Sequence, residues 1–314
     1  MKSRQIGAVV SIFLTTHLSP AVAGDILPPP AQVSKHVYAW IGPLPGPNKE
    51  NQGFRMNLSF IVGKNAVAAV DTGYTEAMAK EMLAHIAKIT PVPVKYAINT
   101  SSQPHRYMGN RVFMENGATV IAHIKEVERM EKDGLQMAAG VDRALELPSG
   151  TTKPPPVPNK VIEQDLELDL GDLKIEIKHM GATHTPAQLI VNVPADKVVC
   201  AGDILYSGRL LAVLPVSKVK TWITAYDNLK QFGDSIFIPG HGQPGKLETF
   251  QFSTRDYLGL LYNHMTKMVD AGADIQDAIK KLDQSAYSKL PLFEDLAGRN
   301  ASWTYLEVEA ASFQ

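Results

Sequence analysis

Four residues of this chain have side chains that bind metal ions or exchange protons and stand in short, turn-rich segments. They are His105, His184, Asp203 and His241. A glycine precedes each of the last three within three residues, which lets the backbone turn sharply and leaves room for a ligand. Three imidazoles and one carboxylate suffice for one four-coordinate zinc ion, or for a three-ligand zinc with a bound water, if they converge. Such an ion lowers the pKa of its water to about 7, so the chemistry indicated is metal-assisted hydrolysis.

The composition is that of an ordinary globular protein. The chain has 314 residues, of which 45% are hydrophobic and 20% charged, and this balance excludes a disordered chain. The net charge of −1, without basic blocks, argues against a nucleic-acid binder, whose affinity depends on clustered Lys and Arg. The single Cys200 excludes an intramolecular disulfide and any zinc site built from several cysteines.

Apolar runs separated by turn residues predict the elements that must position these side chains. In the first half we expect strands over 37–41, 56–62, 66–70, 94–99 and 118–122, and helices over 76–89 and 125–132. In the second half we expect strands over 166–170, 173–177, 189–193, 198–201 and 236–238, and a helix over 222–232. Strands interleaved with helices indicate an α/β fold of two or four layers.

Two further segments complete a single domain over residues 24–314. The Pro/Thr-rich stretch 134–160 is predicted to be a surface flap or insertion rather than a domain boundary. The tail over 247–314 is mostly helical by its pattern of apolar residues.

The order of these motifs resembles the metallo-β-lactamase superfamily. The residues that carry the resemblance are Asp71-Thr72-Gly73 after a hairpin, Gly181-Ala182-Thr183-His184-Thr185, the Gly202-Asp203 pair and Pro239-Gly240-His241-Gly242. The similarity runs from about residue 37 to about residue 242, and the chain looks most similar to exported members called quinoprotein-associated or sulfur-oxidation-associated zinc metallohydrolases. It implies a four-layered αββα sandwich with the active site along one edge. It also implies that Asp71 is a structural aspartate that orients a ligand loop.

The first metal loop departs from the family pattern. That pattern reads T-H-x-H-x-D-H, whereas residues 100–106 read T-S-S-Q-P-H-R. Ser101 and Gln103 replace two histidines, His105 stands at the aspartate position and Arg106 at the next histidine position, if the loop is matched without a gap up to Gly109-Asn110. A one-residue slip would instead place His105 on the later histidine. Either match leaves too few ligands for two zinc ions.

Two interpretations stay open at this point. In the first, one zinc ion is held by His184, Asp203, His241 and His105, and the protein hydrolyses an ester, thioester, lactam or similar bond, with His105 and Asp203 as catalytic residues. In the second, Arg106 pairs with Asp203 in place of the metal, and the protein is a non-catalytic binding or accessory protein. Its polar pocket, formed by Gln103, His105, Arg106, Asp71 and Asn110, would then hold an anionic small molecule or a protein partner.

The first 23 residues predict export to the periplasm or secretion. Lys2 and Arg4 give a basic start, residues 6–14 form an apolar stretch too short to stay in a bilayer, and Ala21-Val22-Ala23 fits a cleavage site. No later window contains 18 uninterrupted apolar residues, so we expect no membrane span after cleavage.

Cleavage after Ala23 is directly measurable. Intact-mass measurement of the mature protein should show a chain that begins at Gly24. A mass that still includes Met1 or Lys2 would refute this prediction.

Overall fold

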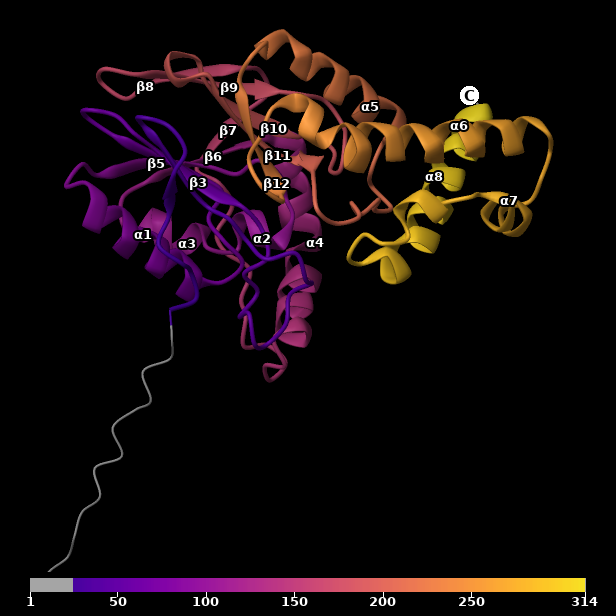
Figure 1. Ribbon diagram of the computed structural model, residues 1–314. Helices are drawn as coiled ribbons and strands as arrows, with labels where there is room; N and C mark the ends of the chain where they lie inside the picture. The colour runs from indigo at the N-terminus through magenta and orange to yellow at the C-terminus, as the bar shows by residue number, and fades with distance from the viewer. Residues whose placement is uncertain (1–24, 314) are drawn as a thin grey trace, which may run out of the picture.

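The computed structural model describes residues 25–313 and consists of two β-sheets packed face to face (Figure 1). The predicted export signal over 1–23 lies outside the described residues. The first sheet contains, in spatial order, β1 (Ala31–Gln32), β2 (Val37–Trp40), β3 (Leu58–Val62), β4 (Val67–Val70), β5 (Val94–Ile98), β6 (Thr119–His123) and β7 (Lys160–Ile162). The second contains β12 (Ile236–His241), β11 (Val198–Tyr206), β10 (Leu189–Val193), β9 (Lys174–His179) and β8 (Leu166–Asp169).

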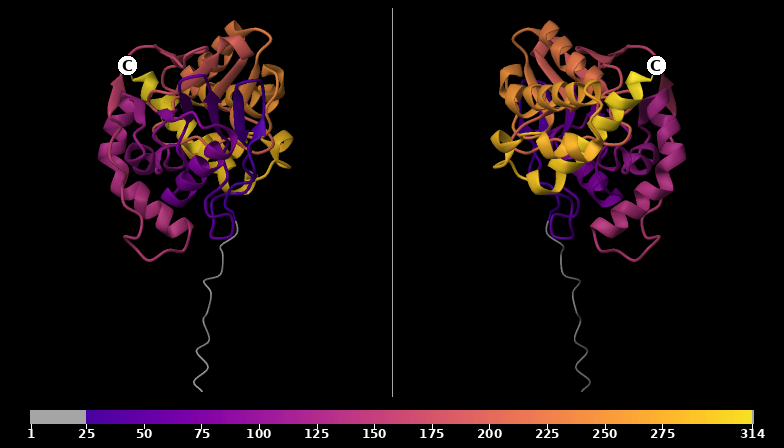
Figure 2. Two further views of the ribbon diagram at one scale, coloured as in Figure 1. Left: turned by 90° about the vertical axis from the view of Figure 1, so that its left-hand side faces the viewer. Right: turned by 90° about the vertical axis from the view of Figure 1, so that its right-hand side faces the viewer.

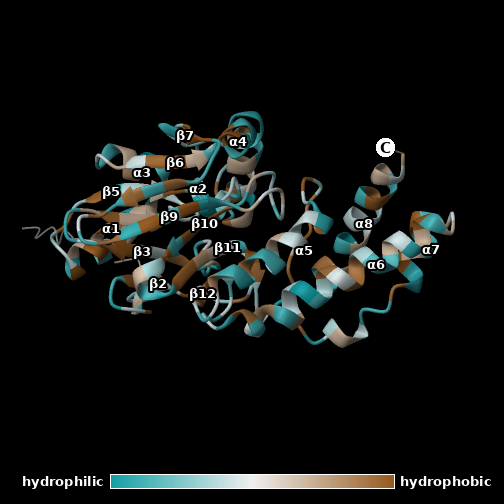
Figure 3. Ribbon diagram, turned by 90° about the horizontal axis from the view of Figure 1, so that it is seen from above, coloured by the Kyte–Doolittle hydropathy of each residue, from teal (hydrophilic) through white to brown (hydrophobic). Residues whose placement is uncertain are grey.

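Helices cover the outer face of each sheet. The first sheet is covered by α1 (Glu76–Ile89), α3 (Asn110–Glu115) and α4 (Ile124–Ala144), and the short α2 (Pro104–Tyr107) lies at its edge. On the second sheet, α5 (Val219–Asn228) packs against β11, and α6 (Tyr257–Asp270) packs against α5. Helices α7 (Ile275–Lys281) and α8 (Phe293–Ser312) pack against α6 and against each other, to one side of the strands (Figure 3). Short 3-10 or π turns occupy η1 (Pro194–Asp196), η2 (Leu229–Phe232), η3 (Leu247–Phe250), η4 (Gln251–Asp256) and η5 (Ser285–Tyr287). The four layers confirm the predicted αββα fold and the helical tail.

The core between the two sheets explains why the strands read as continuous apolar runs. Ile61, Val70 and Ile98 of the first sheet pack against residues such as Val191 and Ile238 of the second. All nine residues of β11 and all five of β10 are buried, as expected for strands covered on both faces. In Figure 3 the hydrophobic colour concentrates on the strands, whereas α5 and α6 show both hydrophilic and hydrophobic residues.

The strands at the site edge change direction between the two halves of each sheet. Strands β1 to β4 pair antiparallel, and β4, β5, β6 and β7 pair parallel. In the second sheet only β11 and β12 are parallel. Parallel neighbours end at the same edge, so the segments after β4 and β5 start together, and so do those after β11 and β12.

Part of the predicted flap over 134–160 is helical, which corrects that expectation. Helix α4 continues to Ala144, because Met130, Ala138 and Val141 recur at helical spacing on its buried face. Gly134 does not break the helix, and Pro154 of the returning loop packs close to it. The remaining loop, 145–159, is held by the carboxylate of Asp142, which accepts from backbone N–H groups of that loop. Figure 2 shows α4, in magenta, along one outer side of the molecule.

The helical tail is fixed to the sandwich by a buried amide. Asn300 of α8 accepts a hydrogen bond from the backbone N–H of Val213 at 2.7 Å and donates to the carbonyl of Leu211 at 2.8 Å. The tail therefore positions the loop that follows β11. Within residues 25–313, no helix is long and apolar enough to cross a membrane.

Candidate functional site

Four strands, or the segments that follow them, bring charged or ligating side chains to one side of the molecule. Asp71 follows β4, Arg106 lies on α2 after β5, Asp203 lies on β11, and His241 ends β12. Gly240 comes so close to the group that a Cβ at this position would clash with Asp203 Oδ1 and with Arg106 Nη2. Only glycine permits the ion pair described below.

Three of the four predicted metal ligands converge. His105 Nε2 lies 3.3 Å from Asp203 Oδ2, and His241 Nε2 lies 3.4 Å from Asp203 Oδ1. One ligand atom from each residue lies within 4.8 Å of the other two, and all three residues are buried. This His–Asp–His triad could hold a single metal ion.

His184 does not belong to the triad. Its Nδ1 donates to the carbonyl of Ala212 at 2.9 Å, and its ring packs edge-on against Trp222 with centroids 5.4 Å apart. The resemblance implies that His184 is a metal ligand, but here it is packed into the aromatic core beside the triad.

Arg106 occupies the centre of the site and uses its whole guanidinium. Its Nε and Nη2 donate to the two carboxylate oxygens of Asp203 at 3.1 and 2.6 Å. Nη1 donates to Asp71 Oδ2 at 3.0 Å and to the carbonyl of Asn57 at 2.8 Å. Nη2 also donates to the carbonyl of Gly240 at 3.2 Å. A guanidinium has five N–H groups, and all five are satisfied.

The two carboxylates depend on this cation to different degrees. Burial alone would raise the pKa of Asp203, but the charge of Arg106 outweighs burial and holds this pKa well below its ordinary value. Burial raises the pKa of Asp71 to about 6, although Arg106 and the N–H and hydroxyl of Thr100 oppose the shift. Burial would lower the pKa of Arg106, but Asp203 and Asp71 raise it instead. At neutral pH all three groups are charged.

The histidines of the site are neutral. Burial, followed by the charge of Arg106, lowers the pKa of His105 to about 3. Burial lowers the pKa of His184 to about 4. Burial, followed by the charge of Arg209, holds the pKa of His241 well below its ordinary value.

His241 presents an unused lone pair to the site. Its Nδ1 lies 2.8 Å from the carbonyl oxygen of Arg55, and because a carbonyl only accepts, Nδ1 carries the ring proton. Nε2 of the neutral ring is then an acceptor, and within the described part of the chain it has no hydrogen-bond partner. An orphaned imidazole nitrogen beside a carboxylate is the arrangement a metal ion would satisfy.

The residues therefore fit a metal ion in spacing but not in charge. The separations of 3.3 and 3.4 Å suit ligands around one ion with bonds of about 2.0–2.2 Å. Both oxygens of Asp203, however, already accept from Arg106, and a divalent ion on the same carboxylate would be repelled by that guanidinium.

The other predicted pocket residues lie around this centre. Asn110 pairs with Asn99 and accepts from the hydroxyl of Thr72 at 2.9 Å, so it supports the loop rather than contacting the triad. Gln103 stands at the start of α2, half-buried, and makes no side-chain cap for that helix. Neither one reaches the ligand atoms.

Sequence reasoning missed three residues next to the triad. Tyr206 stacks on His241 with centroids 5.0 Å apart, and the guanidinium carbon of Arg209 lies 5.6 Å from the Tyr206 ring centroid. Arg55 precedes β3 and holds His241 through its carbonyl. In the sequence, Arg209 follows a glycine and Arg55 precedes an apolar run. Both patterns are too common to identify a functional residue.

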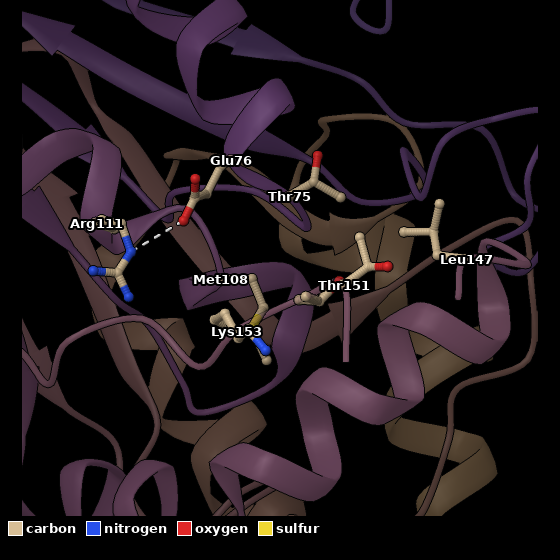
Figure 4. A pocket seen from close by; sticks show the side chains of 8 residues that line it. Thr75, Glu76, Met108, Arg111, Leu147, Thr151 and Lys153 are labelled. Carbon is tan, nitrogen blue, oxygen red and sulfur yellow. Dashed lines mark hydrogen bonds and ion pairs between the residues drawn. The ribbon is translucent and has the colours of Figure 1, made fainter. Parts of the chain in front are cut away.

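A separate cavity of about 420 Å³ lies where the loop over 145–159 meets the starts of α1 and α3 (Figure 4). Its lining residues are Thr75, Glu76, Met108, Arg111, Leu147, Thr151, Thr152 and Lys153. Glu76 and Arg111 form an ion pair of 3.1 Å on one side of it. The loop that was expected to act as a flap thus forms one wall of this cavity, and none of the triad residues lines it.

Comparison with known proteins agrees with this architecture. A family model described as the metallo-beta-lactamase superfamily matches residues 53–241, more than half of the chain. The metallo-beta-lactamase type 2 of Bacillus cereus is 23% identical over 221 residues, covering 68% of this chain and 77% of that protein. The linear primary-alkylsulfatase of Pseudomonas sp. (strain ATCC 19151) is 19% identical over 252 residues, and the match covers 68% of this chain but only 47% of the sulfatase.

A solved structure gives the same result for the fold. The metallo-beta-lactamase from Pontibacter korlensis superimposes with a TM-score of 0.60 at 17% identity, covering 73% of this chain and 98% of that one. The chain therefore belongs to the metallo-beta-lactamase superfamily.

Removing Arg106 should destabilise the fold. Arg106→Ala leaves Asp203 buried without its partner, so we expect the free energy of unfolding to fall by about 3 kcal/mol or more. The matched control is Arg111→Ala, whose ion pair with Glu76 is 36% and 44% exposed and should contribute less than about 1 kcal/mol. Urea unfolding of both variants measures the difference, and equal losses would contradict the central role of Arg106.

Acid should destabilise the protein through the buried histidines. In the unfolded chain His105, His184 and His241 take up protons as the pH falls below about 6.5, whereas their lowered pKa values prevent this in the folded chain. Asp71 acts in the opposite direction between about pH 4 and 6, because its pKa is raised in the folded state. The destabilising effect of the three histidines exceeds the stabilising effect of Asp71. We therefore predict that the unfolding free energy is lower at pH 5 than at pH 7 by at least about 2 kcal/mol.

The measurement is urea unfolding at the two pH values, with His184→Gln as a second variant. The substitution should reduce the difference between pH 7 and pH 5. Equal stability of the unsubstituted protein at both values would refute the assignment of neutral buried histidines.

Proposed function

We propose that this protein works without a resident metal ion and binds a small anionic molecule at the edge formed by the strand ends. The observation that carries the proposal is the saturated guanidinium of Arg106, which satisfies both oxygens of Asp203 and reaches Asp71. It supplies the positive charge that a metal ion would otherwise give to these carboxylates. In this role the protein is a binding or accessory protein that keeps the hydrolase fold.

The charge balance supports the same conclusion. The guanidinium of Arg106 gives both Asp71 and Asp203 a cationic partner without any metal ion. A zinc ion would add two positive charges beside a buried guanidinium, where charge repulsion is far stronger than in water. Zinc binding would also require His105 Nε2, which lies 3.3 Å from Asp203 Oδ2, to carry no proton.

A metal-dependent hydrolase with one ion is the second candidate, favoured by the orphaned Nε2 of His241. His105, Asp203 and His241 would hold the ion, which when bound would activate a water molecule for attack on an ester, thioester or lactam bond. The similarity to a beta-lactamase and an alkylsulfatase supports hydrolysis as the reaction of this second candidate.

We also propose a cellular location for the protein and a subgroup of the superfamily to which it belongs. The sequence of residues 1–23 supports export to the periplasm or secretion. The resemblance over residues 37–242 supports a place among the exported quinoprotein-associated or sulfur-oxidation-associated members of the superfamily.

Zinc titration separates the two candidates. Protein purified without chelator should contain less than one zinc per chain, and calorimetric titration should detect no binding at micromolar zinc, because Arg106 opposes a second cation on Asp203. One equivalent bound, and lost in His241→Ala, would instead establish the mononuclear hydrolase. Two equivalents would contradict both candidates, since Ser101, Gln103 and Arg106 replace the ligands of a second ion.

A further inference from the structure

The cavity between the loop over 145–159 and the starts of α1 and α3 has the size of a small-molecule site. Its volume of about 420 Å³ lies in the range of about 300–1,000 Å³ that is typical of such sites. The loop wall is fixed, because the carboxylate of Asp142 accepts hydrogen bonds of 2.8 Å from the backbone N–H groups of Gly150 and Thr152. A ligand therefore meets a cavity that does not have to form on binding.

The charged side chains of this cavity leave one cation without a partner. Glu76 accepts a hydrogen bond from Arg111 Nε at 3.1 Å, and Arg111 Nη2 donates to the carbonyl of Pro154 at 3.2 Å. Lys153 lies on the loop wall, and among residues 25–313 its ammonium takes part in no ion pair or hydrogen bond. Two basic side chains and one acidic side chain leave one positive charge, so the electrostatic complement of the cavity is an anion.

Apolar surface borders this positive charge. Met108, between α2 and α3, and Leu147 of the loop both line the cavity. Leu147 is 39% exposed although its side chain is large and apolar. In Figure 4 it lies on the opposite side of the cavity from the pair of Glu76 and Arg111. An apolar group that covers Leu147 would remove both surfaces from water, which favours binding.

The cavity lies on the edge of the molecule to which the proposed function assigns the anion. Helix α1 follows β4, α2 and α3 follow β5, and these two strands are parallel neighbours. At the centre of the triad site, Arg106 uses its five donors within the protein, so none is free for an anion. This differs from the expectation that Gln103, His105 and Arg106 hold the ligand.

We propose that this cavity binds a small monocarboxylate with an apolar body. The carboxylate lies on the ammonium of Lys153, and the apolar body packs against Met108 and Leu147. Arg111 supports the same carboxylate, because a guanidinium has five N–H groups and only two of them have partners among residues 25–313. This inference rests on the proposed function and names the cavity and the class of the anionic molecule.

The experiment is calorimetric titration of the full chain with hexanoate and benzoate, and with acetate and 1-hexanol as partial probes. Hexanoate and benzoate carry both a carboxylate and an apolar body, whereas acetate lacks the apolar body and hexanol lacks the charge. We expect one saturable site for hexanoate or benzoate. Acetate and hexanol should bind at least about tenfold more weakly, because each loses one of the two contributions.

Two variants locate the site. Lys153→Gln should weaken the affinity for the bound carboxylate by about fivefold or more, because it removes the cationic partner. Leu147→Asn should weaken it by about threefold or more, because it removes apolar contact. Both side chains are exposed, so both variants should fold, and their urea unfolding midpoints check this. Lys289→Gln, which changes an exposed lysine before α8, is the matched control and should leave the affinity unchanged.

Three results would overturn the proposal. They are no saturable binding of hexanoate or benzoate, equal affinity for hexanoate and hexanol, and unchanged carboxylate affinity in Lys153→Gln. Binding that persists unchanged in Lys153→Gln would place the anion elsewhere on the protein and would leave the proposed function standing. One equivalent of zinc in the separate zinc titration would instead overturn the proposed function, so the two failures are distinguishable.

Discussion

The contact on which the rest of the site depends is the guanidinium of Arg106 between two buried carboxylates. It joins Asp203 of the second sheet to Asp71 of the first, so one side chain crosslinks the two sheets at their functional edge. Gly240 is required because any larger residue would displace this pair. Asn57 reinforces the same junction, since its side chain donates to the carbonyls of Pro239 and Gly242.

The charge of Arg106 also affects protonation and metal binding at the neighbouring histidines. A permanent buried cation disfavours a proton on His105 and a metal ion on Asp203 for the same electrostatic reason. The His–Asp–His triad has the spacing of a metal site, but both oxygens of Asp203 already accept hydrogen bonds from Arg106.

Local pattern was enough to predict most strands, and the resemblance supplied the four layers. The strand predicted over 198–201 was too short, because β11 continues to Tyr206 and contains Asp203. The predicted helix over 76–89 coincides with α1, where Thr75 caps the first turn and Pro91 follows the end. The extension of α4 to Ala144 was missed, since two glycines obscured its buried face. That His184 lies outside the triad depends on side-chain directions, which spacing along the chain does not specify.

The most direct test of the account is a crystal structure from crystals grown with zinc, with diffraction data collected on both sides of the zinc absorption edge. The account predicts Arg106 between Asp71 and Asp203, and no anomalous peak among His105, Asp203 and His241. An anomalous zinc peak within bonding distance of those three side chains, with Arg106 turned away from Asp203, would contradict it.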